Sequence, residues 1–298
     1  MKSFKLVFSG FFFGICFILS GCDNGFSEDP AFPERELSEE FKKYWFAGEA
    51  EITSYQLHQS RYGENREGQS VLIFVTESFL PKEQVKANSE GDSNLPVMKL
   101  NATKKFNTGI YPYSIMESTF YPLTENGHAL KVSASIQEWC GHVYMQLNNR
   151  NGYEIDLHSY FAGEADVEFE LETNYMENEV WTQLRINPDH LPTGEIKMIP
   201  SFEFFRMAHL EIAPYTAKAE FYRDKDLNVY KITYPELNRH LKIFFEPVFP
   251  FKIIKWEETI EREGEKYTTT AVKMEEIKTD YWNKNSNNDL PLRNKLNL

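Results

Sequence analysis

The chain has few cysteines, and this limits how it can be stabilised. Its 298 residues include three, Cys16, Cys22 and Cys140. Cys16 lies inside an N-terminal apolar segment and Cys22 directly follows that segment, so Cys140 is the single cysteine of the remaining chain. A lone cysteine excludes an internal disulfide and a cysteine-rich zinc site. Stability must therefore come from an apolar core.

Positive charge is also scarce. The chain has 32 basic and 45 acidic residues, which give a formal net charge of −13. A surface this acidic is repelled by nucleic acids and by anionic lipid surfaces, so neither is an expected partner.

Motifs for cofactors and metals are missing too. The stretch "GENREG" at 63–68 contains neither a Walker pattern nor a dinucleotide fingerprint, and "DKDLN" at 224–228 is too short for a calcium loop. His209 and His240 have no metal-ligand partners nearby in the sequence. The sequence therefore predicts no cofactor and no metal.

The N-terminus has the pattern of a signal peptide. Lys2 and Lys5 precede an uncharged apolar run from 6 to 21, which ends in "LSGC" at 19–22. The run is shorter than the roughly 20 residues that a membrane-spanning helix needs. The "LSGC" stretch resembles the bacterial lipobox, whose cysteine is acylated and becomes the new N-terminus. The alternatives are a retained anchor helix and a secreted protein in which Cys22 has no special role.

Removal of residues 1–21 would leave a lipid-anchored chain with a flexible tether. Cleavage removes two lysines and no acidic residue, so the net charge changes from −13 to −15. Residues 22–37 are polar, with prolines at 30 and 33, and are too poor in apolar residues to fold alone. Asp23 resembles an inner-membrane retention signal of some bacteria, and acidic residues here resemble a surface-export signal of others. We favour the outer membrane, on its periplasmic or its surface face.

Alternation of apolar and polar residues dominates the rest of the chain. From 155 to 172 the odd positions are mostly apolar or small, and most even positions from 164 onward are acidic. This alternation predicts a strand that bends near Gly163, with its acidic face in water rather than around a calcium ion. Similar stretches, including "EIKMIPSFEFF" at 195–205, also read as strands.

Helical signals are sparse. Ser38 is the predicted N-cap of a helix over 39–45, and Met176, Val180 and Leu184 share one face of an amphipathic stretch over 174–184. The predicted fold class is therefore mainly β, with a large curved or partly closed antiparallel sheet and a few short helices. We assign the globular region to 38–298, with the option of two similar halves that meet near 150–160.

The five-residue stretch "FAGEA" occurs twice, at 46–50 and at 161–165. The two copies are followed by similar alternation, which favours two equivalent strand entries. Coincidence and a ligand-binding signature are the alternatives.

The best candidate for chemistry lies between 136 and 144. In a continuous strand Glu138, Cys140, His142 and Tyr144 would share a face, and with Trp139 they form a candidate pocket. A bulge near Gly141 would instead turn Trp139 inward, together with Val143, Met145 and Leu147, and expose His142. A third hypothesis makes Cys140 a nucleophile that is assisted by a base from another strand.

Several long stretches resemble an uncharacterised family of bacterial lipoproteins, found chiefly in Bacteroidetes. They include "YWFAGEAEITSYQLHQSRYGENREG" at 44–68, "LNATKKFNTGIYPYSIM" at 100–116 and "SIQEWCGHVYMQLNNR" at 135–150. Members are often labelled "septum formation inhibitor Maf". This chain lacks the Ser-x-Ser-Pro-Arg-Arg motif of the Maf nucleotide pyrophosphatases, so the resemblance implies a lipoprotein and not that activity.

The sequence therefore favours a membrane-anchored envelope lipoprotein without catalytic residues. It would act as a binding or structural module for an apolar ligand, a glycan or a partner protein in the envelope. The alternative is an envelope hydrolase that uses Cys140 with a histidine such as His142.

Overall fold

The compact body of the protein begins slightly earlier than the sequence predicts. The computed structural model describes residues 33–125 and 127–298, and residues 33–298 form one compact unit. The predicted signal peptide and Cys22 lie outside the described residues. Glu34 forms an isolated β-bridge with Thr124, and the Arg35 Nε donates to the Thr124 carbonyl at 3.1 Å. Residues 33–37, predicted as tether, are thus attached to the body.

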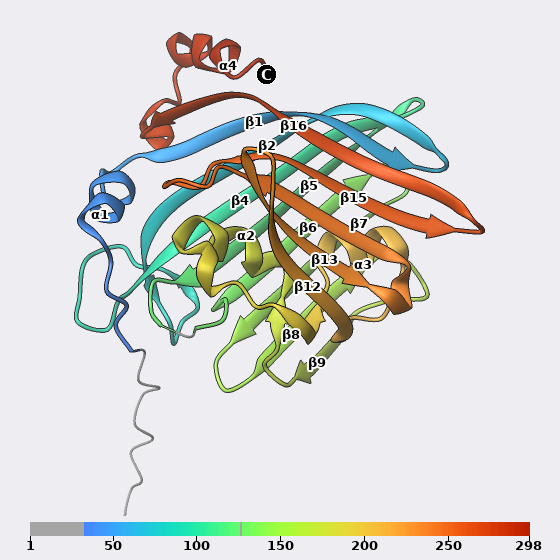
Figure 1. Cartoon of the computed structure of the whole chain (residues 1–298), viewed down its shortest axis with the longest axis horizontal. Coiled ribbons are helices and arrows are strands. Elements are labelled where there is room, and N and C mark those ends of the chain that lie inside the picture. Colours follow the sequence, from blue (N-terminus) through green and yellow to red (C-terminus); the bar gives the residue numbers. More distant parts are fainter. Residues whose placement is uncertain (1–32, 126) are drawn as a thin grey trace, which may run out of the picture. The chain divides into compact units, whose positions relative to one another are not determined.

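The fold is mainly β, which confirms the predicted class. In the described part of the chain, sixteen strands form one open, almost entirely antiparallel sheet, accompanied by four short α-helices (Figure 1). The strands are β1 (Ala50–Arg61), β2 (Glu64–Leu80), β3 (Val85–Lys86), β4 (Leu95–Thr108), β5 (Tyr111–Pro122), β6 (Lys131–Glu138), β7 (Gly141–Asn149), β8 (Tyr153–Ser159), β9 (Val167–Leu171), β10 (Tyr175–Met176), β11 (Gly194–Ile199), β12 (Tyr215–Asp224), β13 (Leu227–Tyr234), β14 (Arg239–Phe245), β15 (Ile253–Arg262) and β16 (Glu265–Thr279). The helices are α1 (Glu39–Trp45), α2 (Glu177–Ile186), α3 (Phe202–Ala208) and α4 (Pro291–Lys295). Among the described residues, every helix is too short or too polar to span a bilayer.

Two runs of strands join in the middle of the sheet. β1 to β9 follow one another along the sheet, apart from the short β3 beside β2, and β11 to β16 form the second run. The last strand, β16, pairs with the first, β1, so that Ala50 lies opposite Thr279. The free edges are β9 and the two-residue β10, which pairs in parallel with β11. The chain passes from one run to the other between β9 and β10, and both runs belong to one sheet.

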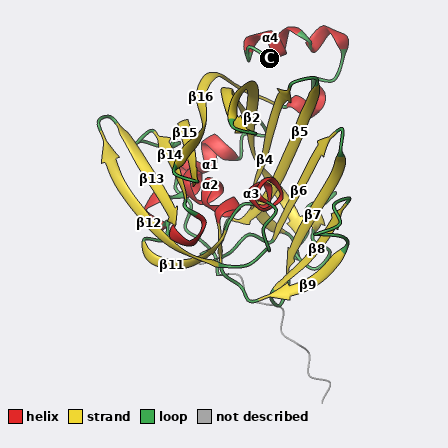
Figure 2. Cartoon of the chain, turned by 90° about the vertical axis from the view of Figure 1, so that its right-hand side faces the viewer, coloured by secondary structure: helices red, strands yellow, loops and turns green. Residues whose placement is uncertain are grey.

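The sheet curves around helices α2 and α3. Figure 2 shows both helices between the arm of β11–β15 and the arm of β4–β9, while α4 lies outside the curved sheet. Apolar side chains on the concave face form one core with these helices, and Val132, Met145, Val180 and Phe205 are among its buried members. Burial of each such side chain stabilises the fold by about 1.5 to 3 kcal/mol.

Local signals explain the two helices that were predicted. The Ser38 side chain accepts a hydrogen bond from the Phe41 amide at 3.1 Å, so α1 begins where its N-cap is predicted. Met176, Val180 and Leu184 are buried at the centre of the fold, as the amphipathic pattern indicates. The polar face of α2 is also largely buried, because it faces the interior charges described below.

Two strand predictions are wrong in detail. The alternating stretch 155–172 is not one bent strand but the hairpin of β8 and β9, in which Ile155 lies opposite Phe169. The stretch 195–205 ends as a strand at Ile199 and continues as helix α3. Pro200 has no amide proton for the sheet, and the Ser201 side chain caps α3 by accepting from the Phe204 amide at 3.2 Å.

Candidate functional site

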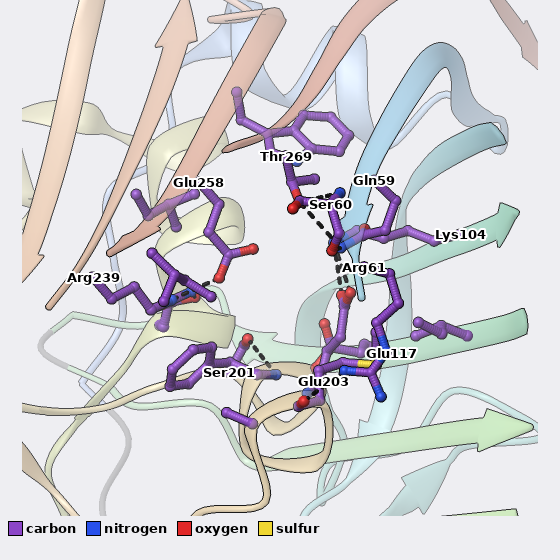
Figure 3. Close-up of a pocket in the computed structure, with 18 of the residues that line it drawn as sticks. Gln59, Ser60, Arg61, Lys104, Glu117, Ser201, Glu203, Arg239, Glu258 and Thr269 are labelled. Carbon is purple, nitrogen blue, oxygen red and sulfur yellow. Dashed lines mark hydrogen bonds and ion pairs between the residues drawn. The ribbon is translucent and has the colours of Figure 1, made fainter. Parts of the chain in front are cut away.

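A cavity of ≈ 580 Å³ lies between the concave face of the sheet and helices α2 and α3 (Figure 3). Nine elements supply its walls: β1, β2, β4, β5, β14, β15, β16, α2 and α3. Its apolar lining residues include Leu72, Leu100, Ala102, Ile115, Trp181, Phe204, Met207, Leu241, Trp256 and Ile260. The volume lies in the range of about 300 to 1,000 Å³ that small-molecule sites occupy.

One wall carries a buried cluster of Lys104, Glu117 and Glu203. The Lys104 ammonium lies 2.8 Å from the Glu203 carboxylate, and the Glu117 Oε1 accepts from the Asn178 amide at 2.9 Å. The backbone N–H of Glu203 also donates to the Glu117 Oε1 at 3.0 Å. Burial, together with the neighbouring Glu203 carboxylate, raises the pKa of Glu117 to about 7. Burial alone would lower the pKa of Lys104, but the nearby carboxylates outweigh it and raise that pKa.

The opposite wall carries a second cluster, centred on Arg239. Its guanidinium donates to both oxygens of Glu177 at 2.5 and 2.7 Å, and its Nε donates to the Glu258 Oε1 at 2.6 Å. The Tyr234 hydroxyl donates to the same Glu177 at 2.9 Å, and the Phe204 ring lies 4.2 Å from the guanidinium carbon. Burial would raise the pKa of Glu258, but the Arg239 and Lys104 charges hold it below its usual range. Each of the three Arg239 nitrogens therefore donates to a carboxylate.

The two clusters leave acceptors without partners. Within the described residues the Oε2 atoms of Glu117 and of Glu258 accept no hydrogen bond. The Gln59 Oε1 and the Ser70 Oγ are also buried without a partner, and both residues line the cavity. Buried polar groups are usually hydrogen-bonded, so the Gln59 Oε1 and the Ser70 Oγ are exceptions beside the cavity, which Glu117 and Glu258 also line.

The cavity reaches solvent between two hairpin turns. Tyr62 and Gly63 form the turn between β1 and β2, Arg262 and Glu263 belong to the turn between β15 and β16, and all four are exposed cavity-lining residues. Arg61 lies beside them and donates to the Met207 carbonyl at 2.8 Å. The mouth therefore lies at the ends of the strands.

The structure places the predicted candidate pocket elsewhere. Trp139 and Cys140 form the tight turn between β6 and β7, where Glu138 lies opposite Gly141. Trp139, Cys140, His142 and Tyr144 are exposed, and none of the five candidate residues lines the large cavity. The turn, rather than a bulge, reverses the faces, because β7 begins a new strand. Val143, Met145 and Leu147 do point inward as the bulge hypothesis expects, but Trp139 is 70% exposed.

The local chemistry of Cys140 is opposite to that of an activated nucleophile. Its backbone N–H donates to the Glu138 Oε2 at 2.6 Å, and the Glu138 carboxylate raises the pKa of the Cys140 thiol. A nucleophilic cysteine needs a lowered pKa and a cationic neighbour. The His142 side chain is exposed and forms no hydrogen bond with the described residues.

Glu138 instead belongs to a polar chain beside the cavity. It lies 3.6 Å from Arg206, whose guanidinium contacts the His209 Nε2 at 3.2 Å. The His209 Nδ1 in turn contacts the Glu164 carboxylate at 2.6 Å. His209 lines the cavity, so one of the two histidines noted in the sequence reaches the site while Glu138 supports it from behind.

The two copies of "FAGEA" each precede a strand but differ in conformation. The first runs from the end of α1 into β1 and has Gly48 at φ +73°, whereas the second is a turn in which Ala165 has φ +55°. The second copy contacts the site, because its Glu164 carboxylate lies 2.6 Å from the Nδ1 of the cavity-lining His209. The shared letters therefore correspond to two different local structures.

Sequence reasoning missed the charged residues of the cavity, although a signal for them exists. In β4, Lys104 falls on the same face as Leu100 and Phe106, because all three are even-numbered positions. In β5, Glu117 falls on the same face as Tyr113 and Ile115, which are also odd-numbered. Arg239 and Glu258 likewise fall in line with apolar, inward-facing residues. A charged residue at an inward position of a strand is the pattern that marks an interior polar site.

A second, smaller cavity of ≈ 330 Å³ lies on the outer face of the sheet, beneath the C-terminal segment. It is lined mainly by apolar residues of β1, β2, β16 and the segment that includes α4, among them Ile52, Val71, Ile73, Ile277, Leu292 and Leu296. It contains no buried charge cluster like those of the large cavity.

Comparisons with known proteins place the chain in no family. No protein-family model matches it, and neither the curated proteins nor the solved structures include a significant match.

Proposed function

We propose that this protein is a lipid-anchored envelope protein that binds a small molecule in the large cavity, without catalysing a reaction on it. The observation that carries the proposal is the cavity with its two buried charge clusters. The anchor part rests on the "LSGC" stretch at 19–22, and we place the protein at the outer membrane.

Stability alone does not explain this interior. A buried ion pair is often no more stabilising than apolar residues of the same volume, because both charges lose their hydration. Here the paired charged side chains also line a cavity of ≈ 580 Å³. Space and unpartnered polar atoms at the same place are typical of a binding site, where a ligand supplies the missing contacts.

The mixture of lining residues also limits the ligand class. Trp181, Trp256 and Leu241 offer flat or branched apolar surface, while the charge clusters fix orientation. A ligand with an apolar body and a polar end matches both kinds of wall.

Native mass spectrometry of the full-length protein, purified from membranes, tests the proposal. We expect a co-purified small molecule that is lost in Ala102→Trp, because the indole would occupy the cavity. Ser114→Trp is the matched control, since Ser114 is exposed on the neighbouring strand β5. Equal ligand occupancy in both variants, or no ligand in the wild type and no stabilisation by a panel of amphipathic molecules, would contradict the proposal.

A further inference from the structure

We infer that the ligand of the large cavity is an organic cation, an ammonium or guanidinium group on an apolar body. This inference rests on the proposed binding function and assigns its ligand class. It follows from the hydrogen-bonding state of the cavity walls, their charge balance and their shape.

Each cation of the inner walls is paired with a carboxylate, whereas two carboxylate oxygens have no hydrogen bond in the described part of the chain. Lys104 is held by Glu203 at 2.8 Å, and Arg239 is held by Glu177 and Glu258 at 2.5 to 2.7 Å. The Oε2 atoms of Glu117 and Glu258 have no partner among the described residues. A ligand can therefore donate hydrogen bonds to these two carboxylates.

Two neutral groups add to this surplus of acceptors. The Gln59 amide donates to the Thr269 hydroxyl at 3.1 Å, but its Oε1 is buried without a partner. Gln59 is 5% exposed and Ser70 is 1% exposed, and the Ser70 hydroxyl is likewise unpartnered. An amide oxygen is an acceptor only, whereas the Ser70 hydroxyl can either donate or accept.

The charge balance of the inner walls favours a positive ligand. Lys104 and Arg239 face four carboxylates, those of Glu117, Glu177, Glu203 and Glu258. With Glu117 protonated these six inner side chains carry one excess negative charge, and with Glu117 ionised they carry two. The whole lining also includes Arg61, Arg262 and Glu263 at the mouth, and it is neutral in the first state and carries one excess negative charge in the second. One bound monovalent cation would neutralise the inner side chains in the first state and halve their excess in the second.

The walls suit an organic cation better than a metal ion. Among the described residues no group of three or more His, Cys, Asp or Glu side chains is arranged to hold a metal. The aromatic rings of Trp181, Phe204 and Trp256 line the same cavity, and aromatic faces attract organic cations at close range. At the mouth, Arg61, Arg262, His209 and Glu263 line the entrance. The cation must therefore pass this entrance to reach the inner carboxylates.

Isothermal titration of full-length protein in a non-ionic detergent tests the inference with three probes of equal length. Hexylammonium, hexanol and hexanoate differ in charge and share the same apolar chain, and protein-free micelles correct for partitioning. We expect hexylammonium to bind roughly tenfold to hundredfold more tightly than hexanol, the range of one charge-assisted hydrogen bond. Hexanoate should bind most weakly.

An isosteric pair of variants locates the cation. Glu258→Gln keeps an acceptor for Arg239 but removes the carboxylate charge, so hexylammonium should bind at least about tenfold more weakly while hexanol is unaffected. Glu257→Gln is the matched control, because Glu257 is the next residue of β15 and does not line the cavity. Thermal melting confirms that both variants fold, and the three-probe comparison on the wild type does not depend on either.

The outcomes separate this inference from the proposed function. Equal or tighter binding of hexanol or hexanoate, abolished by Ala102→Trp, would overturn the cation assignment and leave the binding function standing. Failure of hexylammonium to bind at all would also overturn the cation assignment. The native mass spectrometry experiment on the co-purified molecule would then decide whether the binding function stands.

Discussion

Replacement of Glu117 by glutamine should stabilise the ligand-free protein near neutral pH. Glu117 lies on β5 and accepts a hydrogen bond from the backbone of α3, and burial and Glu203 raise its pKa from 4.5 to about 7. The folded protein therefore binds this proton more tightly than the unfolded chain does. The resulting stabilisation is fully present below about pH 4.5 and is lost as the pH rises through about 7. A glutamine side chain at this position does not titrate and so would avoid this loss.

The magnitude follows from the same pKa. Each pKa unit corresponds to 1.36 kcal/mol, so a rise from 4.5 to about 7 implies a loss of about 3 kcal/mol in wild-type stability between pH 4.5 and pH 8. The amide oxygen of glutamine keeps the acceptor for Asn178 and for the Glu203 N–H. The difference in unfolding free energy, Glu117→Gln minus wild type, should therefore grow by about 3 kcal/mol over this window.

Guanidinium unfolding between pH 4.5 and pH 8.5 measures this difference. Tryptophan fluorescence is a suitable signal, because Trp181 and Trp256 line the cavity. Glu257→Gln removes one negative charge outside the cavity and is the control for the change in net charge. A difference curve for Glu117→Gln that is flat with pH, or that parallels the control, would refute the argument that Glu117 is held in a costly environment.

Three further predictions test other parts of the molecule. Glu51 and Arg185 form a buried pair at 2.6 and 2.8 Å, so Glu51→Gln should lower the unfolding free energy by about 3 to 5 kcal/mol, and chemical unfolding that shows less than about 1 kcal/mol would contradict this. Cys140 should react slowly with a thiol reagent at neutral pH despite its exposure, and Glu138→Gln should speed the reaction severalfold; rapid wild-type labelling would show a nucleophilic thiol instead. Cys22→Ser should abolish labelling by a palmitate analogue while Cys140→Ser leaves it unchanged, and label that persists in Cys22→Ser would contradict the lipobox.

Local patterns in the sequence predict much of the fold. Alternation identifies most strands, and Ser38 predicts the start of α1, because a strand's faces and a helix cap are set by neighbouring residues. The same reasoning fails where two patterns compete. The stretch after Ile199 continues to look apolar and aromatic, yet Pro200 and Ser201 end the strand and begin α3.

The candidate site could not be assembled from the sequence, because it depends on distant pairings. Lys104 and Glu258 face one cavity only because β16 pairs with β1, which brings the end of the chain against its beginning. No local pattern encodes that pairing. Charged residues at inward-facing strand positions would have identified the members of the site, but not the fact that they lie close together in the fold. By contrast, the candidate residues at 138–144 were grouped because they are neighbours in sequence. The turn between β6 and β7 separates them on the surface of the fold.

The placement of the charges separates structural from functional ones. Arg185 and Glu51 are each 1% exposed, with both carboxylate oxygens engaged by Arg185 and a further hydrogen bond from Tyr44 at 2.5 Å. That pair is complete and needs no further partner. Glu117 and Glu258 are only partly satisfied and border open volume, although each is held by groups that fix its position. The fold gives the Glu51 carboxylate all its hydrogen-bond partners. A side chain that filled the cavity could do the same for Glu117 and Glu258. The proposed ligand would complete the hydrogen bonding of the cavity carboxylates, and Glu117→Gln measures what their incomplete satisfaction costs in stability.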